Sequence, residues 1–298
     1  MTTTLQSIPE RVLTIGPDQN VIGIVTEAPA RAGGGSPEPD RPNIMFLNAG
    51  VLHRVGPHRL HVTLARLLAA EGFRGLRIDL SGIGDSRNLP GTLTFRESSI
   101  ADARSAMDCL PAQSGVAQFI CFGLCSGADN GLATALADER VVGLILVDPP
   151  TYATIRSHMR ALGDKLSSFR GAVVPMAAWA AGVAARRARQ YLQTLMRRLT
   201  GRDSNVPTQA QGRALPLPEE LYSQFSALLD RGVRILCVFS GANGAGYNDR
   251  EQLYESFPRL RGRMDVMYFP AANHVFTELD ARAALLGAVT GWCRENFG

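Results

Sequence analysis

Short apolar runs alternate with amphipathic stretches along most of the chain. The runs are rich in aliphatic and β-branched residues and are bounded by turn-forming residues, a pattern typical of buried strands. Seven stretches show this pattern: 21–26, 43–47, 76–80, 118–122, 141–147, 234–239 and 264–269.

Helices are predicted in the intervals between these runs. Apolar residues recur at helical spacing over 60–68, 100–110 and 285–293, and small residues predict a further helix over 128–137. Gly72 lies where the first of these helices would stop. Strands that alternate with helices imply a mostly parallel sheet with helices on both faces, which is an α/β fold.

Residues 151–230 interrupt this alternation. They have helical character without a strand signal, and the strand pattern resumes after them. The sequence therefore predicts one α/β domain formed by residues 1–150 and 231–298, with residues 151–230 inserted as a helical cap.

The composition is that of a globular protein. The chain has 298 residues, of which 45% are hydrophobic and 19% charged, so it is too apolar to be disordered. Its five cysteines are widely spread and include no CxxC pair, which argues against a disulfide scaffold or a zinc ribbon. The N-terminus lacks the features of a signal peptide, and no apolar run reaches a spanning length of about 18 residues. We therefore expect a cytoplasmic protein without a membrane span.

Positive charge is concentrated in the predicted cap. Residues 151–213 contain eleven basic and two acidic residues, a balance of +9 within a total of +4, so the rest carries 4 − 9 = −5. This confinement argues against a nucleic-acid binder. The cap arginines fit either a solvated helix face or recognition of a phosphate, as in coenzyme A, a phosphopantetheine arm or an acidic carrier protein. They are Arg186, Arg187, Arg189, Arg197, Arg198 and Arg202.

The segment 123–127 (GLCSG) fits the nucleophile elbow G-x-S-x-G with cysteine in the central place. A nucleophile on a tight strand-to-helix turn takes strained backbone angles, so its neighbours must be small. The N–H of the next residue, Ser126, would point at the bound carbonyl oxygen. The helix N-terminus favours the thiolate form of Cys125 and stabilises an oxyanion. Ser126 is a second candidate nucleophile, but it lies one place late in the motif.

A candidate general base follows the last predicted strand. His274 lies in a loop at the carboxyl edge of the parallel sheet, the side on which the nucleophile is expected. The chain order nucleophile, acid, base also favours it over the other histidines. Those are His53, His58, His61 and His158.

Two loops after early strands complete the predicted site. The loop 48–51 (NAGV) is expected to give the second oxyanion N–H, from Gly50 or Val51. The polar stretch 79–86 (DLSGIGDS) is interpreted as a structural turn that braces this edge of the sheet.

The chain resembles an α/β-hydrolase over nearly its whole length, through the elbow 123–127, the turn 79–86 and the late His274. More closely, residues 48–59 (NAGVLHRVGPHR), the following helix and the GLC elbow resemble cysteine-type hydrolases found with bacterial exosortase systems and related proteins beside biosynthetic gene clusters. The resemblance implies a Cys-His acyl-transfer site in a cytoplasmic enzyme. Cysteine at this position is also similar to dienelactone hydrolases and to polyhydroxyalkanoate synthases, where it can hold an acyl group for transfer.

The chain departs from the family pattern at the acid. Most α/β-hydrolases have an aspartate after the penultimate strand, where this chain has Asn243, with Asp249 six residues further on. Asp148 ends the strand before the cap, a position that some lipases use. Three hypotheses remain: Asp148, Asn243 or Asp249 orients His274. We favour Asp148 because it ends a strand at the reactive edge.

These residues predict an enzyme that forms an acyl-cysteine on Cys125 from an ester or thioester. Two alternatives remain open, namely an acyltransferase that uses the same intermediate and a catalytically silent binding protein with the same fold. The chain shows no GxGxxG loop, metal-ligand cluster or flavin motif, so no cofactor and no metal are expected.

Overall fold

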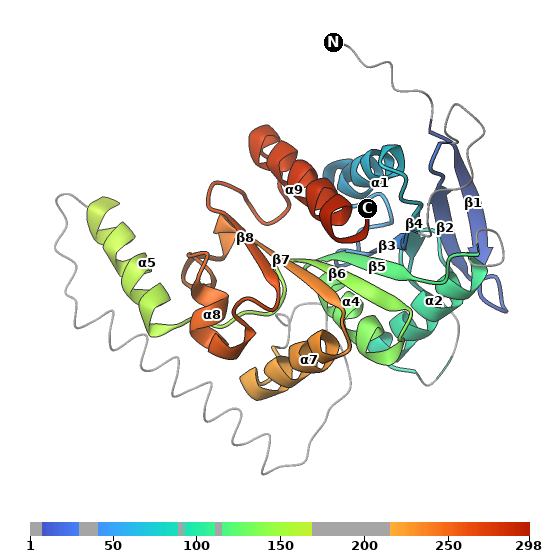
Figure 1. The fold of residues 1–298 in the computed structure, drawn as a ribbon. Coiled ribbons are helices and arrows are strands. Elements are labelled where there is room, and N and C mark those ends of the chain that lie inside the picture. The colour runs from blue at the N-terminus through green and yellow to red at the C-terminus, as the bar shows by residue number, and fades with distance from the viewer. Residues whose placement is uncertain (1–7, 30–40, 89–90, 92, 111–114, 169–214) are drawn as a thin grey trace. The chain divides into compact units, whose positions relative to one another are not determined.

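Eight strands among the described residues form one sheet in the order β1-β2-β4-β3-β5-β6-β7-β8 (Figure 1). The computed structural model describes residues 8–29, 41–88, 91, 93–110, 115–168 and 215–298. The strands are β1 (Glu10–Ile15), β2 (Val21–Thr26), β3 (Asn43–Leu47), β4 (Gly75–Asp79), β5 (Phe119–Leu124), β6 (Val141–Val147), β7 (Arg234–Ser240) and β8 (Asp265–Phe269).

The predicted mostly parallel sheet is confirmed. Strand β2 pairs antiparallel with β1 and β4, and every pairing from β4 to β8 is parallel. All seven strands predicted from apolar runs are present, with ends that match or differ by at most two residues. Strand β1 was not predicted, because it lies at the sheet edge and only Ile15 of its residues is fully buried. It therefore lacks the continuous apolar run that marks the other strands.

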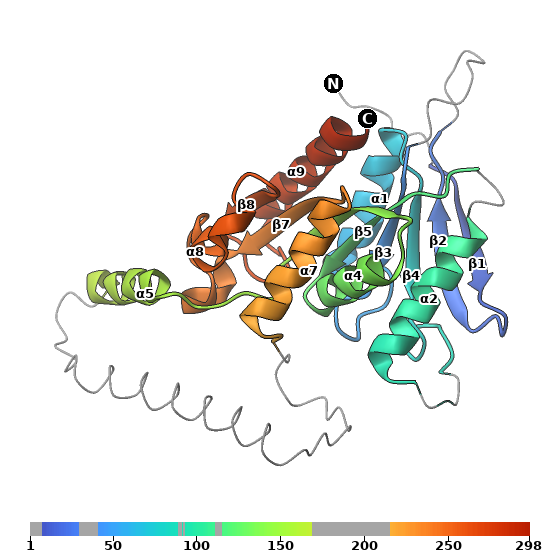
Figure 2. The same ribbon diagram turned by 60° about the horizontal axis from the view of Figure 1, so that its bottom comes forward.

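The described helices are η1 (Pro57–Arg59), α1 (Leu60–Ala70), α2 (Phe95–Cys109), α4 (Ser126–Ala137), α5 (Ile155–Ser168), α7 (Pro218–Asp230), η2 (Gly241–Gly246), α8 (Gln252–Ser256), η3 (Pro258–Leu260) and α9 (Leu279–Phe297). Helices α1 and α9 lie on one face of the sheet, and α2, α4 and α7 form a layer on the other (Figure 2). None of these helices combines the length and the apolar character needed to cross a bilayer.

Two apolar cores separate the sheet from these layers. On one face, α1 and α9 pack with Phe46 and Phe122 of the central strands. On the other face, α2, α4 and α7 pack with Met45 and Cys121 of the same strands. Side chains of a strand alternate between the two faces, so both faces of β3 and β5 are covered and every residue of these strands is buried. The central strands are thus rigid supports for the loops at their carboxyl ends.

Helix α2 begins earlier than the apolar spacing predicts. Thr94 is its N-cap, and its hydroxyl accepts a hydrogen bond from the Glu97 N–H while the Glu97 carboxylate accepts one from the Thr94 N–H. This capping box satisfies backbone donors that the first turn leaves without helical partners, and so sets where the helix begins.

The chain divides into two compact units, residues 1–158 with 215–298 and residues 159–214. Helix α7, which the sequence assigned to the cap, buries Leu221, Phe225 and Leu228 in the core shared with α4 of the first unit. The cap over 151–230 stays a prediction, because 169–214 lie outside the described residues. The six cap arginines lie there too.

Candidate active site

Cys125 lies at the turn between β5 and α4, with φ 57° and ψ −119°. A non-glycine residue at positive φ is strained, and such strain is common at functional sites. The two glycines of the motif make the turn possible. A Cβ at Gly123 would overlap the Gly127 carbonyl group, and a Cβ at Gly127 would lie 2.7 Å from the Asn48 carbonyl oxygen. The elbow predicted from the sequence is therefore formed, with the cysteine at its apex.

His274 lies in the loop between β8 and α9. Asn273 fixes this loop, because its side-chain oxygen accepts hydrogen bonds from the N–H groups of Val275, at 3.2 Å, and Thr277, at 3.1 Å. The Asn273 N–H in turn donates to the Glu278 carboxylate at 3.1 Å. A turn held by its own side chain keeps the His274 imidazole at the carboxyl edge of the sheet.

Asp148 ends β6 with φ 48°, and its side chain is buried. Its Oδ2 lies 2.7 Å from His274 Nδ1. Two groups of Ser240 hold the carboxylate in place: the N–H donates to Oδ1 at 2.8 Å and the hydroxyl donates to Oδ2 at 2.7 Å. A carboxylate with this many donors is a fixed acceptor for one ring nitrogen of His274, which leaves the other nitrogen for Cys125.

The structure distinguishes between the three partners considered for His274. Asp148 makes the hydrogen bond. Asp249 instead accepts a hydrogen bond from the Glu251 N–H at 2.8 Å, just before α8. The side chain of Asn243 is outside what the structure describes. The acid that sequence reasoning favoured is thus the residue that contacts His274.

The surroundings of His274 favour its protonated form. Hydrogen bonds to Asp148 and to the Cys125 side chain raise the pKa of His274 from 6.5 to about 10, and the negative charges of both groups add to this, while burial opposes it. The His274 imidazole is thus in contact with both the buried Asp148 carboxylate and the Cys125 side chain.

The loop after β3 brings a backbone donor to the elbow. Gly50 takes φ +59°, a left-handed conformation that suits glycine, and its N–H donates to Ser126 Oγ at 2.7 Å. Ser126 is the first residue of α4, so its own N–H belongs to the helix end, which carries a positive partial charge. Val51, the other residue considered as an oxyanion donor, follows Gly50 and is 71% exposed.

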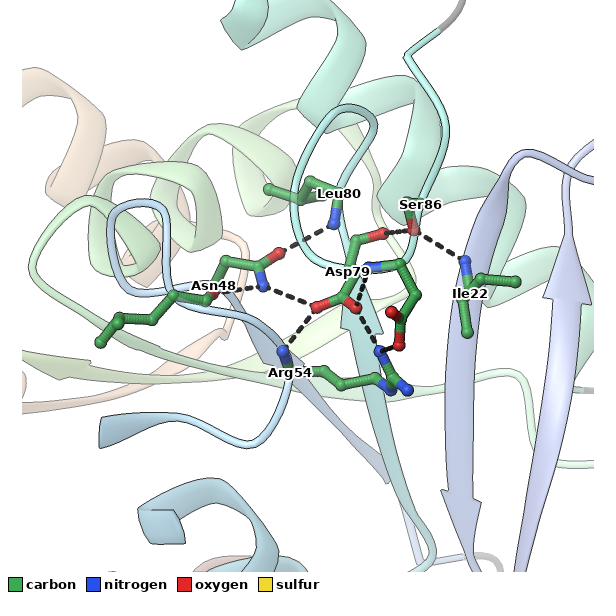
Figure 3. A network of polar contacts seen from close by, with 8 residues as sticks. Ile22, Asn48, Arg54, Asp79, Leu80 and Ser86 are labelled. Atoms are coloured by element: carbon green, nitrogen blue, oxygen red, sulfur yellow. Dashed lines mark hydrogen bonds and ion pairs between the residues drawn. The ribbon is translucent and has the colours of Figure 1, made fainter. Parts of the chain in front are cut away.

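Asp79, the last residue of β4, holds the loop that carries Gly50 in place (Figure 3). Its buried carboxylate accepts hydrogen bonds from Asn48 Nδ2 at 3.2 Å, from the backbone N–H and guanidinium of Arg54, and from the Asp85 N–H at 3.1 Å. Asn48 Oδ1 accepts from the Leu80 N–H at 2.8 Å. Figure 3 shows the Asp79 side chain between Asn48 and Arg54, which lie at the two ends of the loop that carries Gly50. The buried Asp79 carboxylate therefore ties together the two ends of the loop that carries Gly50.

The turn 79–86 is itself tied to the sheet, in agreement with its interpretation as a brace. The Ser86 hydroxyl donates to the Asp79 carbonyl oxygen at 2.7 Å and accepts from the Ile22 N–H of β2 at 2.8 Å. Gly84 has φ +57°, and a Cβ there would overlap the Asp79 carboxylate. Both contacts keep the Asp79 carboxylate at the end of β4.

The other histidines lie elsewhere. His61 is fully buried in α1, packed against the rings of Phe46 and Phe122. His158 is on α5, where its Nδ1 lies 2.7 Å from the carbonyl oxygen of Thr154. His53 and His58 are exposed in the loop before α1. Of the five, His274 is the one whose contacts include both Asp148 and Cys125.

Comparison with known proteins agrees with this architecture. Residues 42–273 match the family described as the alpha/beta hydrolase fold, which is well over half of the chain. The chain belongs to the α/β-hydrolase family. No curated protein matches its sequence.

Solved α/β-hydrolases share the fold at low sequence identity. An esterase from Pyrococcus furiosus is 14% identical with a TM-score of 0.56, over 98% of this chain and 91% of that one. A putative α/β-hydrolase of unknown function from Agrobacterium tumefaciens is 16% identical with a TM-score of 0.54, over 95% and 94%. These likenesses concern the fold, so the chemistry must be argued from this α/β-hydrolase's own residues.

Sequence reasoning missed the polar contacts that hold the site of this α/β-hydrolase together. It did not single out Arg54, Ser240 or the Asn48 side chain, which fix Asp79 and Asp148. Asn48 directly follows β3 and Ser240 ends β7, and this position at the carboxyl end of a strand is the signal that could have identified them, whereas Arg54 lies further along the loop after β3.

Proposed function

We propose that this α/β-hydrolase cleaves esters or thioesters through an acyl-cysteine on Cys125. The observation that carries the proposal is the chain of contacts from Asp148 to His274 and on to Cys125. The strained apex of the elbow, next to the N-terminus of α4, supports the same assignment. Ser126 is the less favoured nucleophile, because its hydroxyl contacts the Gly50 N–H.

In the first half of the reaction, the Cys125 thiolate attacks the substrate carbonyl carbon and forms the C–S bond. The carbonyl electron pair moves to oxygen, and the N–H groups of Ser126 and Gly50 stabilise this oxyanion. As the tetrahedral intermediate collapses, the bond to the alkoxide or thiolate leaving group breaks. The His274 imidazolium gives its proton to that leaving group, and an acyl-cysteine and a neutral imidazole remain.

In the second half, the neutral His274 takes a proton from water while the water oxygen attacks the acyl carbon. The same two N–H groups bind the second oxyanion. Collapse breaks the C–S bond, releases the carboxylic acid and restores the thiolate beside a protonated His274. Asp148 stabilises the imidazolium at both stages, because its buried carboxylate stays hydrogen-bonded to Nδ1.

The chemistry of the thiolate suits thioesters best. An alkoxide or an amine leaves the tetrahedral intermediate less readily than the Cys125 thiolate does, so these leaving groups depend on the proton from His274. A thioester carries a leaving group of comparable basicity, so its acyl group moves forward to the enzyme. We propose an acyl ester or thioester as substrate, with coenzyme A and a carrier protein as the acyl carriers to examine.

Steady-state kinetics with a p-nitrophenyl ester and an acyl thioester test the proposal. Wild type is expected to release the leaving group and the free acid, whereas Cys125→Ala is expected to release neither above background. His274→Ala should slow acylation at least about a hundredfold, the scale of a lost general acid–base catalyst. Cys109→Ala is the matched control, since Cys109 lies at the end of α2 and outside the site.

The fate of the acyl group separates hydrolysis from transfer. Rapid loss of the Cys125 adduct in water supports the hydrolase. An adduct that persists in water but disappears on addition of an alcohol, amine or thiol indicates the acyltransferase. No leaving-group release from any donor contradicts both and favours the silent binding protein.

A further inference from the structure

The Ser126 hydroxyl lies against the backbone donor that the reaction needs. Gly50 N and Ser126 Oγ are 2.7 Å apart, and the N–H donates to the hydroxyl oxygen. Ser126 is half-buried and Gly50 is exposed, so both groups can be reached from solvent. The contact links the oxyanion loop directly to the first residue of α4.

This oxygen occupies one of the two donors that an oxyanion would use. A bound oxyanion must lie about 3 Å from both donor nitrogens, which here are those of Gly50 and Ser126. Ser126 Oγ is within hydrogen-bond distance of the first. It is separated from the second only by Cβ and Cα of its own residue, so it cannot be far from that nitrogen.

We propose that the Ser126 hydroxyl occupies the oxyanion hole of the free enzyme and is displaced by the substrate carbonyl oxygen. This inference rests on the proposed function and adds a role for the Ser126 side chain, distinct from that of its backbone N–H. Rotation about Cα–Cβ moves Oγ away without any backbone change, and among the described residues its one polar contact is the Gly50 N–H.

Replacement of the Ser126 hydroxyl by the substrate oxygen is favoured when that oxygen gains negative charge. An oxyanion accepts a stronger hydrogen bond from the Gly50 N–H than the neutral Ser126 hydroxyl does. The carbonyl oxygen of a neutral ester has no such advantage over the hydroxyl. Displacement of the hydroxyl is therefore most favourable at the tetrahedral stage.

Removal of the hydroxyl should therefore tighten binding of a tetrahedral adduct. The probe is a simple aliphatic aldehyde, whose carbonyl carbon bonds to the Cys125 sulfur while its oxygen takes the electron pair as an oxyanion and the proton stays on His274. We expect Ser126→Ala to bind this aldehyde roughly three- to tenfold more tightly than wild type, the scale of one neutral hydrogen bond. We expect kcat/KM for a p-nitrophenyl ester to rise by a similar factor. Ser126→Thr keeps the hydroxyl and is the matched comparison, expected to bind the aldehyde less tightly than Ser126→Ala.

A second readout does not depend on catalysis. The amide proton resonance of Gly50 should move upfield in free Ser126→Ala, because the N–H loses its acceptor, and should stay in place in Ser126→Thr.

Three results would overturn the inference. An unchanged Gly50 resonance shows that the hydroxyl is not in the hole. Equal aldehyde affinity of wild type and Ser126→Ala shows that it is not displaced, and leaves the proposed function intact. A fall in kcat with unchanged KM makes the hydroxyl an oxyanion donor instead. If neither protein forms an adduct at Cys125, the proposed function fails together with this inference.

Discussion

The Asp148 carboxylate and the His274 imidazole meet through a 2.7 Å hydrogen bond although the residues are 126 positions apart in sequence. The bond joins the carboxyl end of β6 to the loop after β8, across β7. Ser240, the last residue of β7, closes the gap with two hydrogen bonds to the same carboxylate. The acid is thus held by three adjacent strands of the sheet.

Substitution Asp148→Asn should impair catalysis more than folding. An asparagine retains the shape and can still accept a bond from Ser240, but it removes the charge that stabilises the imidazolium. We expect kcat to fall at least about a hundredfold, within the range seen when the acid of a triad is neutralised. Steady-state kinetics check this result. Asp249→Asn, at the residue that accepts from the Glu251 N–H, is the control and should leave kcat unchanged.

The proton on His274 links stability to pH. The pKa of His274 is raised from 6.5 to about 10 by hydrogen bonds to Asp148 and Cys125. The stabilisation is therefore complete below pH 6.5 and disappears as pH rises through about 10. We expect the difference in unfolding free energy between wild type and His274→Asn to shrink over this interval, measured by chemical denaturation. His53→Asn, at an exposed histidine, should show a constant difference. A constant difference for His274→Asn contradicts the assigned ion pair.

Asp79 is expected to act through the oxyanion loop. Substitution Asp79→Asn leaves the Arg54 guanidinium without its buried anion and puts an amide group among donors from Asn48, Arg54 and Asp85. We expect a loss of about 3 kcal/mol in unfolding free energy. We also expect kcat to fall by up to about a hundredfold as the Gly50 N–H shifts.

Thermal denaturation and kinetics on the same preparations measure both effects of Asp79→Asn. Asp85→Asn is the matched control, because Asp85 also pairs with Arg54 but its side chain is 69% exposed. Exposed ion pairs contribute less than about 1 kcal/mol. Equal effects of the two substitutions would show that the buried network does not position the loop.

His61 should make the fold sensitive to acid. Burial, and to a smaller extent the charge of Arg77, lowers the pKa of His61 from 6.5 to about 4. In the unfolded chain this histidine binds a proton below pH 6.5, whereas in the folded chain it binds one only below about pH 4. The free energy of unfolding therefore decreases as the pH is lowered from 6.5 to 4, by about 3 kcal/mol in total. His61→Phe keeps a ring packed against Phe46 and Phe122 and should flatten this decline. Urea denaturation between these pH values tests it, with His53→Phe as a control expected to keep the wild-type slope.

The sequence predicts the fold where burial is continuous. Strands β3 and β5 are buried along their whole length, so they appear as unbroken apolar runs. Strand β1 alternates between exposed and partly buried residues at the sheet edge and has no such run. Only the part of helix α2 after residue 100 is predicted from the spacing of apolar residues, because its first turn is defined by the capping box of Thr94 and Glu97.

The position of strand ends in the sequence also predicts part of the candidate active site. Carboxyl ends of parallel strands share one edge, so Cys125, Asp148 and His274 were expected close together, and the structure brings them there. The choice of Asp148 depends on its backbone angle of φ 48° and on the loop of His274, which sequence spacing does not encode. The bond between Gly50 and Ser126 depends on a rotamer and on a left-handed glycine, so no sequence pattern reveals it.

The central claim is that Cys125 carries the acyl group, and peptide mapping by tandem mass spectrometry tests it most directly. The enzyme is quenched in acid during turnover of a reactive acyl thioester, digested and sequenced. We predict an acyl mass on Cys125 in wild type and in Ser126→Ala, and no acylated peptide from Cys125→Ala. An acyl mass on Ser126, or acylation that persists in Cys125→Ala, would contradict the account.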